Sequence, residues 1–358
     1  MRDRTIRVVL VALVLVFLQP TIPVESAANF TLVELGTLGG NYSEAIAVND
    51  HVQVVGNSEM AGGEYHAFFW ENGVMTDLGI PGHSSSAADI NERGQVLLQE
   101  LGHSFIWENG VMTDLGAFSA VDINDLGQVV GSQNSHAVLW DNGNITDLGT
   151  LGGPESWAIR INERSQVIGS RVTANREQHA FFWENGVMTD LGTFGGWYSA
   201  AWDLNNQGQV VGDTNTDNTG SEQHAFLWEN GVMTDLGTFG GSGSWAYDIN
   251  DRGQVIGGFF DTAGENHVFL WENGVMTQVD TTGRFQYSGA VDINDLGQVV
   301  GNTTKAYGPL ESFVWQSGAI TVLVHGYLRD INNQGTAAVG ILTRENNHVN
   351  VAALWLAK

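Results

Sequence analysis

A histidine recurs directly before the apolar segments that end in tryptophan, and this residue type could bind a metal. It stands at six positions, His66, His103, His136, His179, His224 and His267. Zinc holds ring nitrogens at about 2.0–2.1 Å, whereas packed β-sheets lie about 10 Å apart. Equivalent histidines on neighbouring sheets are therefore too distant to share one ion. We expect each of them to make a structural hydrogen bond instead.

Alternating oxygen-bearing side chains make Asp213, Asn215 and Asp217 a weak candidate for calcium. A calcium loop of this kind needs glycine at its sixth position and a bidentate glutamate at its twelfth. Asn218 and His224 stand at those positions. A polar surface loop is the competing interpretation of this segment.

Signals for other chemistry are missing from the sequence. The chain has no cysteine, which excludes thiolate metal sites, and it carries no nucleophile elbow, phosphate loop or zinc motif. We therefore expect no catalytic residue, no cofactor and no metal. Pairs among the 40 Asp and Glu residues leave one alternative open, a polysaccharide-active enzyme with its carboxylates in the centre of the fold.

A set of aromatic residues interrupts the otherwise repeated sequence and could stack on sugar rings or peptide side chains. The predicted ligand-binding residues are Trp157, Trp197, Tyr198, Trp202, Trp245 and Tyr287, and Tyr247 lies among them. They belong to four consecutive repeats, at places where the second and third repeats carry Ser, Ala and Val. The alternative is that these rings fill the centre of the fold or pack between sheets.

The elements that must position these residues come from one repeat of 33 to 45 residues. Its copies end at Trp70, Trp107, Trp140, Trp183, Trp228, Trp271, Trp315 and Trp355. The strand that ends in tryptophan is apolar on both faces and runs into Asn-Gly, as at Asn185-Gly186, or into Ser317-Gly318. Asn-Gly between apolar strands predicts a type I′ hairpin, so an antiparallel Val-Met-Thr-Asp-Leu strand follows.

A second hairpin precedes the tryptophan strand in each repeat. One arm ends at an asparagine, the turn is Asn-x-x-Gly, and the other arm is Gln-Val-Val-Gly. The asparagine recurs at 49, 91, 124, 162, 205, 250, 294 and 332. Glycine closes such a turn in the left-handed conformation. Val52 and Ser165 replace that glycine, so we expect those two turns to differ from the other six.

Four antiparallel strands per repeat, with no helical segment, predict an all-β fold, a β-propeller of eight four-stranded blades. Alanine stands four residues before the asparagine in seven repeats, which indicates that this strand is the innermost. Residues 30–36 match an outermost strand, and we expect them to close the ring in the last blade. Seven blades is the first alternative, and an open β-solenoid is the second.

This arrangement predicts two unlike faces. Both tight turns, Asn-x-x-Gly and Asn-Gly, fall on one side, which we call the tight-turn face. The two longer connections of every blade fall on the opposite side, the variable face, where the aromatic set lies. Variable loops on a rigid scaffold are the usual place for binding residues.

Three motifs recur in fixed order: Asp-Leu-Gly-Thr-Leu-Gly-Gly, Ala-x-x-Ile-Asn-x-x-Gly-Gln-Val-Val-Gly and His-Ala-Phe-x-Trp. Over residues 30–358 the chain resembles the bacterial HAF-repeat family of extracellular repeat proteins. The resemblance implies a secreted bacterial protein and assigns no catalytic residue.

Residues 1–28 carry a basic start, an apolar run from 8 to 18 and Ser26-Ala27-Ala28, the pattern of a secretory signal peptide. The remainder, 29–358, is expected to form one propeller domain outside the cytoplasm, extracellular or periplasmic, with no membrane span after cleavage. The formal charge of −26 disfavours nucleic acid and anionic membrane surfaces as partners. We expect a monomeric, non-enzymatic binding scaffold for an extracellular carbohydrate or protein.

Overall fold

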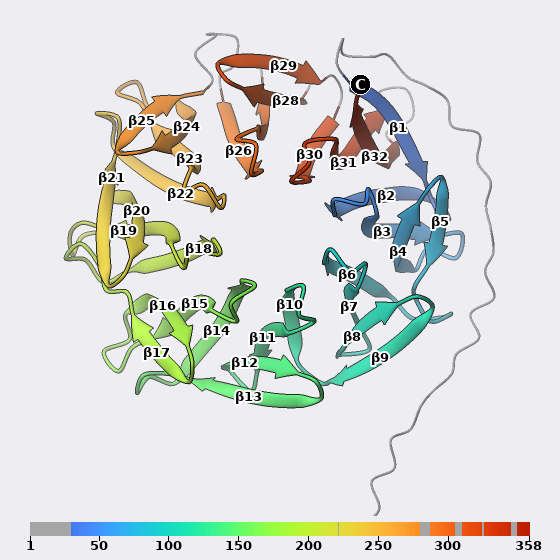
Figure 1. Cartoon of the computed structure of the whole chain (residues 1–358), viewed down its shortest axis with the longest axis horizontal. Coiled ribbons are helices and arrows are strands. Elements are labelled where there is room, and N and C mark those ends of the chain that lie inside the picture. Colours follow the sequence, from blue (N-terminus) through green and yellow to red (C-terminus); the bar gives the residue numbers. More distant parts are fainter. Residues whose placement is uncertain (1–29, 221, 280–286, 305–309, 324–325, 345–348) are drawn as a thin grey trace, which may run out of the picture.

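The computed structural model describes residues 30–220, 222–279, 287–304, 310–323, 326–344 and 349–358. They form eight four-stranded blades around a central axis, which confirms the eight-bladed propeller (Figure 1). One parallel pair of residues links the last blade to the first, Asn350 with Tyr42, and another links the sixth to the seventh, Asn266 with Tyr287. The expected signal peptide, 1–28, lies outside this part of the chain. Among the described residues, no helix has the length and apolar character needed to cross a membrane.

The blades are numbered along the chain, from blade 1 (β2–β5) to blade 8 (β30–β32 with β1). The innermost strands are β2 (Gly39–Val48), β6 (Ser85–Ile90), β10 (Ser119–Ile123), β14 (Glu155–Ile161), β18 (Ser199–Leu204), β22 (Gly243–Ile249), β26 (Tyr287–Ile293) and β30 (Gly326–Ile331). The second strands are β3 (Val54–Met60), β7 (Val96–Glu100), β11 (Val129–Gln133), β15 (Val167–Val172), β19 (Val210–Asn215), β23 (Val255–Phe260), β27 (Val299–Thr304) and β31 (Ala337–Arg344).

The third strands carry the repeated tryptophans, and the strands outside them form the rim. The third strands are β4 (Tyr65–Glu71), β8 (His103–Glu108), β12 (His136–Asp141), β16 (Gln178–Glu184), β20 (Gln223–Glu229), β24 (Asn266–Glu272), β28 (Leu310–Gln316) and β32 (Val349–Ala357). The outermost strands are β5 (Val74–Asp77), β9 (Val111–Gly116), β13 (Asn144–Gly149), β17 (Val187–Asp190), β21 (Val232–Gly237), β25 (Val275–Gln278), β29 (Ala319–Leu323) and β1 (Phe30–Gly36). This order from the axis outward is the predicted one.

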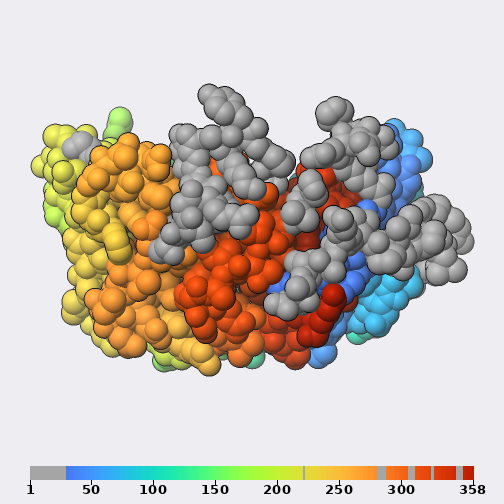
Figure 2. Space-filling view, turned by 90° about the horizontal axis from the view of Figure 1, so that it is seen from above, coloured from blue at the N-terminus to red at the C-terminus, as the bar shows by residue number. Residues whose placement is uncertain are grey.

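The ring closes as expected, through the N-terminal strand. β1 pairs antiparallel with β32, and Leu32 lies opposite Trp355. The residues of β1 thereby supply the outermost strand that blade 8 lacks. Seen edge-on, blade 8 (red) lies against the N-terminal residues (blue) (Figure 2). The first and last parts of the chain therefore share one blade.

The hydrophobic core is divided among the interfaces between blades. Each of the eight interfaces holds one cluster of buried residues. Between blades 3 and 4, for example, Val130 and Leu139 pack with Phe181 and Trp183. Every repeated tryptophan belongs to such a cluster. The alanine of the innermost strand also lies there, so inter-blade packing explains its small size.

Close packing also explains the glycine of Gln-Val-Val-Gly. Gly169 of β15 pairs with Ala158 of β14, and the ring of Phe181 lies over it. A Cβ at Gly169 would lie 2.1 Å from the carbonyl oxygen of Trp157 and 2.7 Å from the Phe181 ring. Only glycine leaves room for both neighbours.

The Asn-Gly hairpins have the predicted turn type. Asn185 and Gly186 have φ of 51° and 83°. The other Asn-Gly pairs and Ser317-Gly318 also have positive φ at both central positions, as a type I′ turn requires.

The expectation that the turns at Val52 and Ser165 differ is wrong. Val52 has a φ of 59° and Ser165 of 60°, within the left-handed region used by the glycines of the other turns. The N–H of Val52 donates to the carbonyl of Asn49 at 3.0 Å, as Gly94 does in the next blade. The Asn49 side chain accepts the N–H of Gln53 at 3.0 Å and so holds the turn closed. The hydrogen bonds of the asparagine therefore hold these turns in the left-handed conformation, although the residue that replaces glycine disfavours it.

Candidate functional site

The repeated asparagine joins the blades on the tight-turn face. Asn162 accepts the N–H groups of Arg164 and Gln166 at 3.0 Å each. Its Nδ2 donates to Gln166 Oε1 at 2.6 Å and to the carbonyl of Asn205 in the next blade at 2.9 Å. The same contact to the next blade recurs around the ring, ending with Asn332 to the carbonyl of Asn49 at 3.4 Å. Hydrogen bonds therefore close the ring independently of the strands.

A second ring of acceptors follows directly after the asparagines. Each side chain in it accepts a backbone N–H from the preceding blade. Glu92 accepts the N–H of Asp50 at 3.1 Å, and Asp125 accepts the N–H of Glu92 at 2.7 Å. The ring contains Asp50, Glu92, Asp125, Glu163, Asn206, Asp251, Asp295 and Asn333. Burial raises the pKa of Glu92 and Glu163. These carboxylates bind the blades together.

A third ring of carboxylates lines the axis itself, and the sequence analysis missed it. It consists of Asp89, Asp122, Asp203, Asp248, Asp292 and Asp330, one from each of six innermost strands. Each accepts a backbone N–H of the next blade, as Asp122 does from Ile161 at 2.7 Å and Asp248 from Ile293 at 2.8 Å. Burial, together with the charge of Asp248, raises the pKa of Asp203 and of Asp292.

Two blades depart from this axial ring. Ala47 and Arg160 occupy the positions of the aspartate in blades 1 and 4. Nε of Arg160 lies 4.0 Å from Asp203 Oδ1. Although burial works against it, the charges of Asp122, Asp203 and other axial carboxylates raise the pKa of Arg160. One cation therefore offsets part of the charge of six acids.

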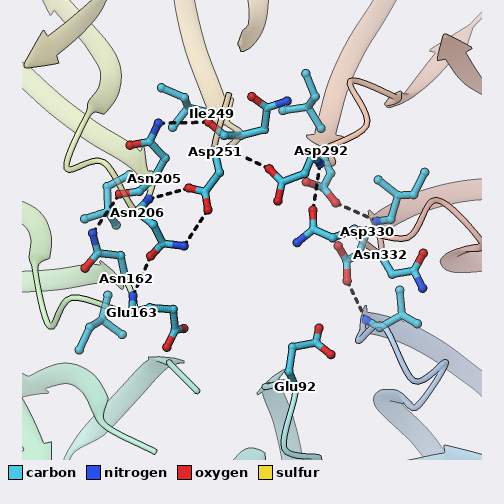
Figure 3. Close-up of a pocket in the computed structure, with 18 residues that line it drawn as sticks. Glu92, Asn162, Glu163, Asn205, Asn206, Ile249, Asp251, Asp292, Asp330 and Asn332 are labelled. Atoms are coloured by element: carbon cyan, nitrogen blue, oxygen red, sulfur yellow. Dashed lines mark hydrogen bonds between the residues drawn. The ribbon is translucent and has the colours of Figure 1, made fainter. Parts of the chain in front are cut away.

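The mouth of the axis on the tight-turn face is a hollow of about 310 Å³. Members of all three rings line it, among them Asp292, Asp330, Glu92 and Asp251 (Figure 3). Its field attracts cations. Its side chains nevertheless hold neighbouring blades through the hydrogen bonds drawn in Figure 3, which gives the acids a structural role.

The histidines of the repeat lie toward the variable face and make the expected structural bonds. In five blades Nδ1 contacts an aspartate eleven residues later, as in His66 with Asp77 at 2.7 Å and His224 with Asp235 at 2.8 Å. In blade 6, His267 Nδ1 lies 3.2 Å from Nε2 of Gln278. The pairing links the third strand of each of these blades to its outermost strand.

The predicted aromatic residues lie at different depths on the variable face. Trp197 and Trp202 are 44% and 41% exposed. Tyr198 is half-buried and its ring centroid lies 5.9 Å from that of Trp197. Trp157 and Trp245 are half-buried, and Trp245 packs edge-on against Phe260 at 5.0 Å. The side chain of Tyr287 lies outside the described residues.

Tyr247 completes an exposed aromatic stretch over blades 5 and 6. It is 36% exposed, and its ring centroid lies 6.3 Å from that of Trp245. Phe239 and Phe260 of the same two blades are 50% and 38% exposed. Repeat-breaking aromatic residues therefore gather on consecutive blades.

The three residues of the weak calcium candidate have different partners. Asp213 and Asn215 lie in β19 and are buried, with 5% and 2% exposure. Asp213 Oδ1 accepts the indole N–H of Trp202 at 2.6 Å. Asp217 Oδ1 accepts the N–H groups of Thr219 and Gly220, each at 3.0 Å, in the turn beyond the strand.

On the variable face, the sequence analysis treated Asp213 only as a weak calcium candidate and did not predict its burial. Burial raises its pKa to about 6, although the bond from Trp202 acts in the opposite direction. Its backbone position in the second strand is taken in the other blades by uncharged residues: Asn57, Gln99, Ser132, Ser170, Gly258, Asn302 and Ile341. Alignment of the eight second strands would have singled it out.

One group in the described residues could hold a metal by its geometry. The ligand atoms of Asp261, Glu265 and His267, at the turn between β23 and β24, lie within 4.8 Å of one another. Asp261 Oδ1 already accepts the N–H groups of Ala263 and Glu265, at 2.8 and 2.9 Å. The cluster is therefore explained by turn formation.

Comparisons with known proteins agree on the architecture. No protein-family model and no curated protein matches the chain. The dipeptidyl peptidase 4 of Porphyromonas gingivalis is similar with a TM-score of 0.54 and 9% identity, over 89% of this chain and 57% of that one. The β-propeller domain of the Trilobed protease from Pyrococcus furiosus is similar with a TM-score of 0.50 and 11% identity, over 88% and 92%.

A puromycin-hydrolysing peptidase of Mycobacterium tuberculosis is similar with a TM-score of 0.50 and 10% identity, over 94% of this chain and 54% of that one. The chain thus spans little more than half the length of two of these proteins. Identities this low show the fold and leave activity open. The strand order, the closure of the ring and these similarities together show that the chain is a β-propeller.

Proposed function

We propose that this protein is an exported, non-enzymatic binding module whose variable face takes an extracellular ligand, carbohydrate or protein. The observation that carries the proposal is the exposure of Trp197, Trp202 and Tyr247 on the links and innermost strands of blades 5 and 6. Large aromatic side chains are usually buried, so several exposed ones on one face are typical of a binding surface.

Export and family membership are proposed from sequence motifs. The pattern of residues 1–28 supports secretion, and the repeated motifs support membership of the HAF-repeat family. The non-enzymatic assignment is supported by the tight-turn face, where each axial carboxylate already accepts a backbone N–H between blades.

Glycan and peptide arrays probed with the mature protein test the proposal. The triple variant Trp197→Ala, Trp202→Ala, Tyr247→Ala should lose retention on the preferred probe by at least about 100-fold, since each fully covered ring contributes about 1.5–3 kcal/mol. Its thermal melt should show that the fold survives.

The matched control changes the opposite face. Glu71→Gln, Glu108→Gln and Glu184→Gln together should leave retention intact, because glutamine can still accept the side-chain bonds from Gln53, Gln95 and Gln166. Retention that survives the aromatic changes and is lost in the control would assign binding to the tight-turn face.

The alternative function is that of a polysaccharide-active enzyme, favoured by the carboxyl groups of raised pKa that line the axial hollow, Glu92, Glu163, Asp292 and Asp330. Such chemistry uses one carboxylic acid and one carboxylate. A release assay on any polysaccharide that retains the protein separates the two functions. Retention without soluble product supports binding, and product lost in Asp292→Asn supports the enzyme.

A further inference from the structure

The buried acid of the variable face has one open side. Asp213 is 5% exposed and lies in the second strand of blade 5, on the same face as Val211, which packs against blade 6. Trp202 donates to Oδ1 at 2.6 Å, and none of the described residues donates to Oδ2. The remaining hydrogen-bonding capacity of the carboxyl group is therefore available to a ligand.

Asp213 also lacks a counter-charge. Within the described ranges, no Lys, Arg or His forms an ion pair with it, whereas Asp203 has Arg160 and Asp190 has both Arg171 and His179. Buried charges are normally paired, because the effective cost of desolvating an ion is several kcal/mol. A cation from outside would supply the counter-charge that Asp213 lacks.

Aromatic rings form the surroundings of this acid. Trp202 of blade 5 is hydrogen-bonded to it, and Tyr247 of blade 6 and Tyr198 of blade 5 lie near enough that its charge, after burial, helps raise their pKa. Trp202 and Tyr247 are still 41% and 36% exposed. The faces of such rings attract organic cations within about 6 Å of their centroids.

Metal ions and neutral ligands fit these surroundings less well. A calcium ion needs six to eight oxygen ligands, and Asp213 belongs to no group of three acidic or histidine side chains among the described residues. A neutral sugar would leave the carboxylate without a counter-charge. A quaternary or alkylated ammonium is matched by both features, the lone negative charge and the aromatic faces. The charge of −26 on the whole chain favours its approach.

We propose that the ligand of the variable face carries an alkylammonium group, which binds between Trp202 and Tyr247 with its charge against Asp213. The inference rests on the proposed binding function and specifies its ligand class. The cation is supplied either by a free small molecule or by a modified lysine side chain of a peptide.

Isothermal titration calorimetry of the mature protein tests this assignment. Choline should bind at least tenfold more tightly than 3,3-dimethyl-1-butanol, its uncharged isostere. Two further probes identify the source: Gly-Lys-Gly carrying a trimethylated lysine, and the same peptide unmodified. Binding of choline alone indicates a small molecule, and binding of the trimethylated peptide indicates a protein partner.

Matched variants locate the charge that is recognised. Asp213→Asn keeps the acceptor for Trp202 and should weaken choline binding at least tenfold. Asp235→Asn makes the same change of charge toward the variable face of the same blade and should leave binding unchanged. Tyr247→Leu removes one ring without touching the acid and should also weaken binding. Thermal melts should confirm that all three variants fold.

Equal binding of choline and its isostere would overturn the inference, as would unchanged binding in Asp213→Asn. Calcium binding that depends on Asp213 would also overturn it and assign a metal. If a neutral oligosaccharide binds through Trp197, Trp202 and Tyr247 and choline does not bind, the alkylammonium site is contradicted and the proposed function stands. If no probe and no array ligand binds, both proposals fail.

Discussion

The two faces of the propeller treat polar side chains in opposite ways. On the tight-turn face, Asn162 fills every donor and acceptor of its side chain, and the same pattern recurs in the neighbouring blades. On the variable face, Asp213 has a carboxyl oxygen without a donor, and the buried Nε1 of Trp245 and Oδ1 of Asn215 have no partner among the described residues. Repetition marks the scaffold, and departures from it mark the residues available to a ligand.

The largest effect should follow from breaking the asparagine ring. Asn250→Ala removes donated bonds to Gln254 Oε1 and the Asn294 carbonyl, at 2.7 and 2.9 Å, and two accepted backbone bonds at 3.0 Å. At about 1 kcal/mol net per bond, the free energy of unfolding should fall by about 4 kcal/mol. Urea unfolding measures it. Trp197→Ala on the variable face should cost less than half as much, and equal losses would remove the distinction between the faces.

The architecture was predictable because the repeat carries it locally. A turn such as Asn185-Gly186 needs positive φ at both positions, and few other residue pairs supply that. Closure of the last blade by residues 30–36 followed from an outermost strand at the N-terminus and a blade that lacked one. Each of these inferences depends on neighbours in sequence or on counting strands.

The axial acids were not predictable from alternation along a strand. In all eight innermost strands the pairing register shifts just before the axial residue, as between Ala201 and Asp203. Such a bulge adds one residue and changes the direction of those that follow, so a period of two assigns them to the wrong face. The sequence analysis named Asp213 only as a weak calcium ligand or as part of a polar surface loop, because it placed the residue in a loop, whereas Asp213 lies in a strand.

Acids of the two faces should contribute to stability with opposite dependence on pH. Burial and the charges of Asp248 and Asp330 raise the pKa of Asp292 in the folded protein. The folded state then binds its proton more tightly than the unfolded state, so stability is full below the unfolded pKa of about 4 and is lost as pH rises through the folded pKa. Asp292→Asn should therefore raise the free energy of unfolding at pH 8 and leave it unchanged at pH 3.

A companion experiment on the variable face uses Asp147, the aspartate that pairs with His136. Although burial acts in the other direction, bonds from His136 and Gly149 lower the pKa of Asp147. Its contribution is present above the unfolded pKa and is lost as pH falls through the folded pKa. Asp147→Asn should thus lower stability at pH 7, and this loss should shrink as the pH falls through the acid range. Melting temperatures of both variants across this pH range test the two predictions. If both variants gain or both lose stability near neutral pH, the difference between the faces is contradicted.

The smallest effect should come from the turns in which glycine is replaced. Val52 holds a φ of 59°, which costs a β-branched residue about 1–2 kcal/mol, whereas Val52→Gly relieves this strain and adds about 0.5–1 kcal/mol of backbone entropy loss. The net gain in the free energy of unfolding should be about 0.5 kcal/mol. Ser165→Gly should gain less or lose, because the Ser165 hydroxyl donates to Gln128 Oε1 of the neighbouring blade at 2.7 Å. Denaturation midpoints that fall by the same amount in both variants would show that side-chain packing, and not φ, decides these positions.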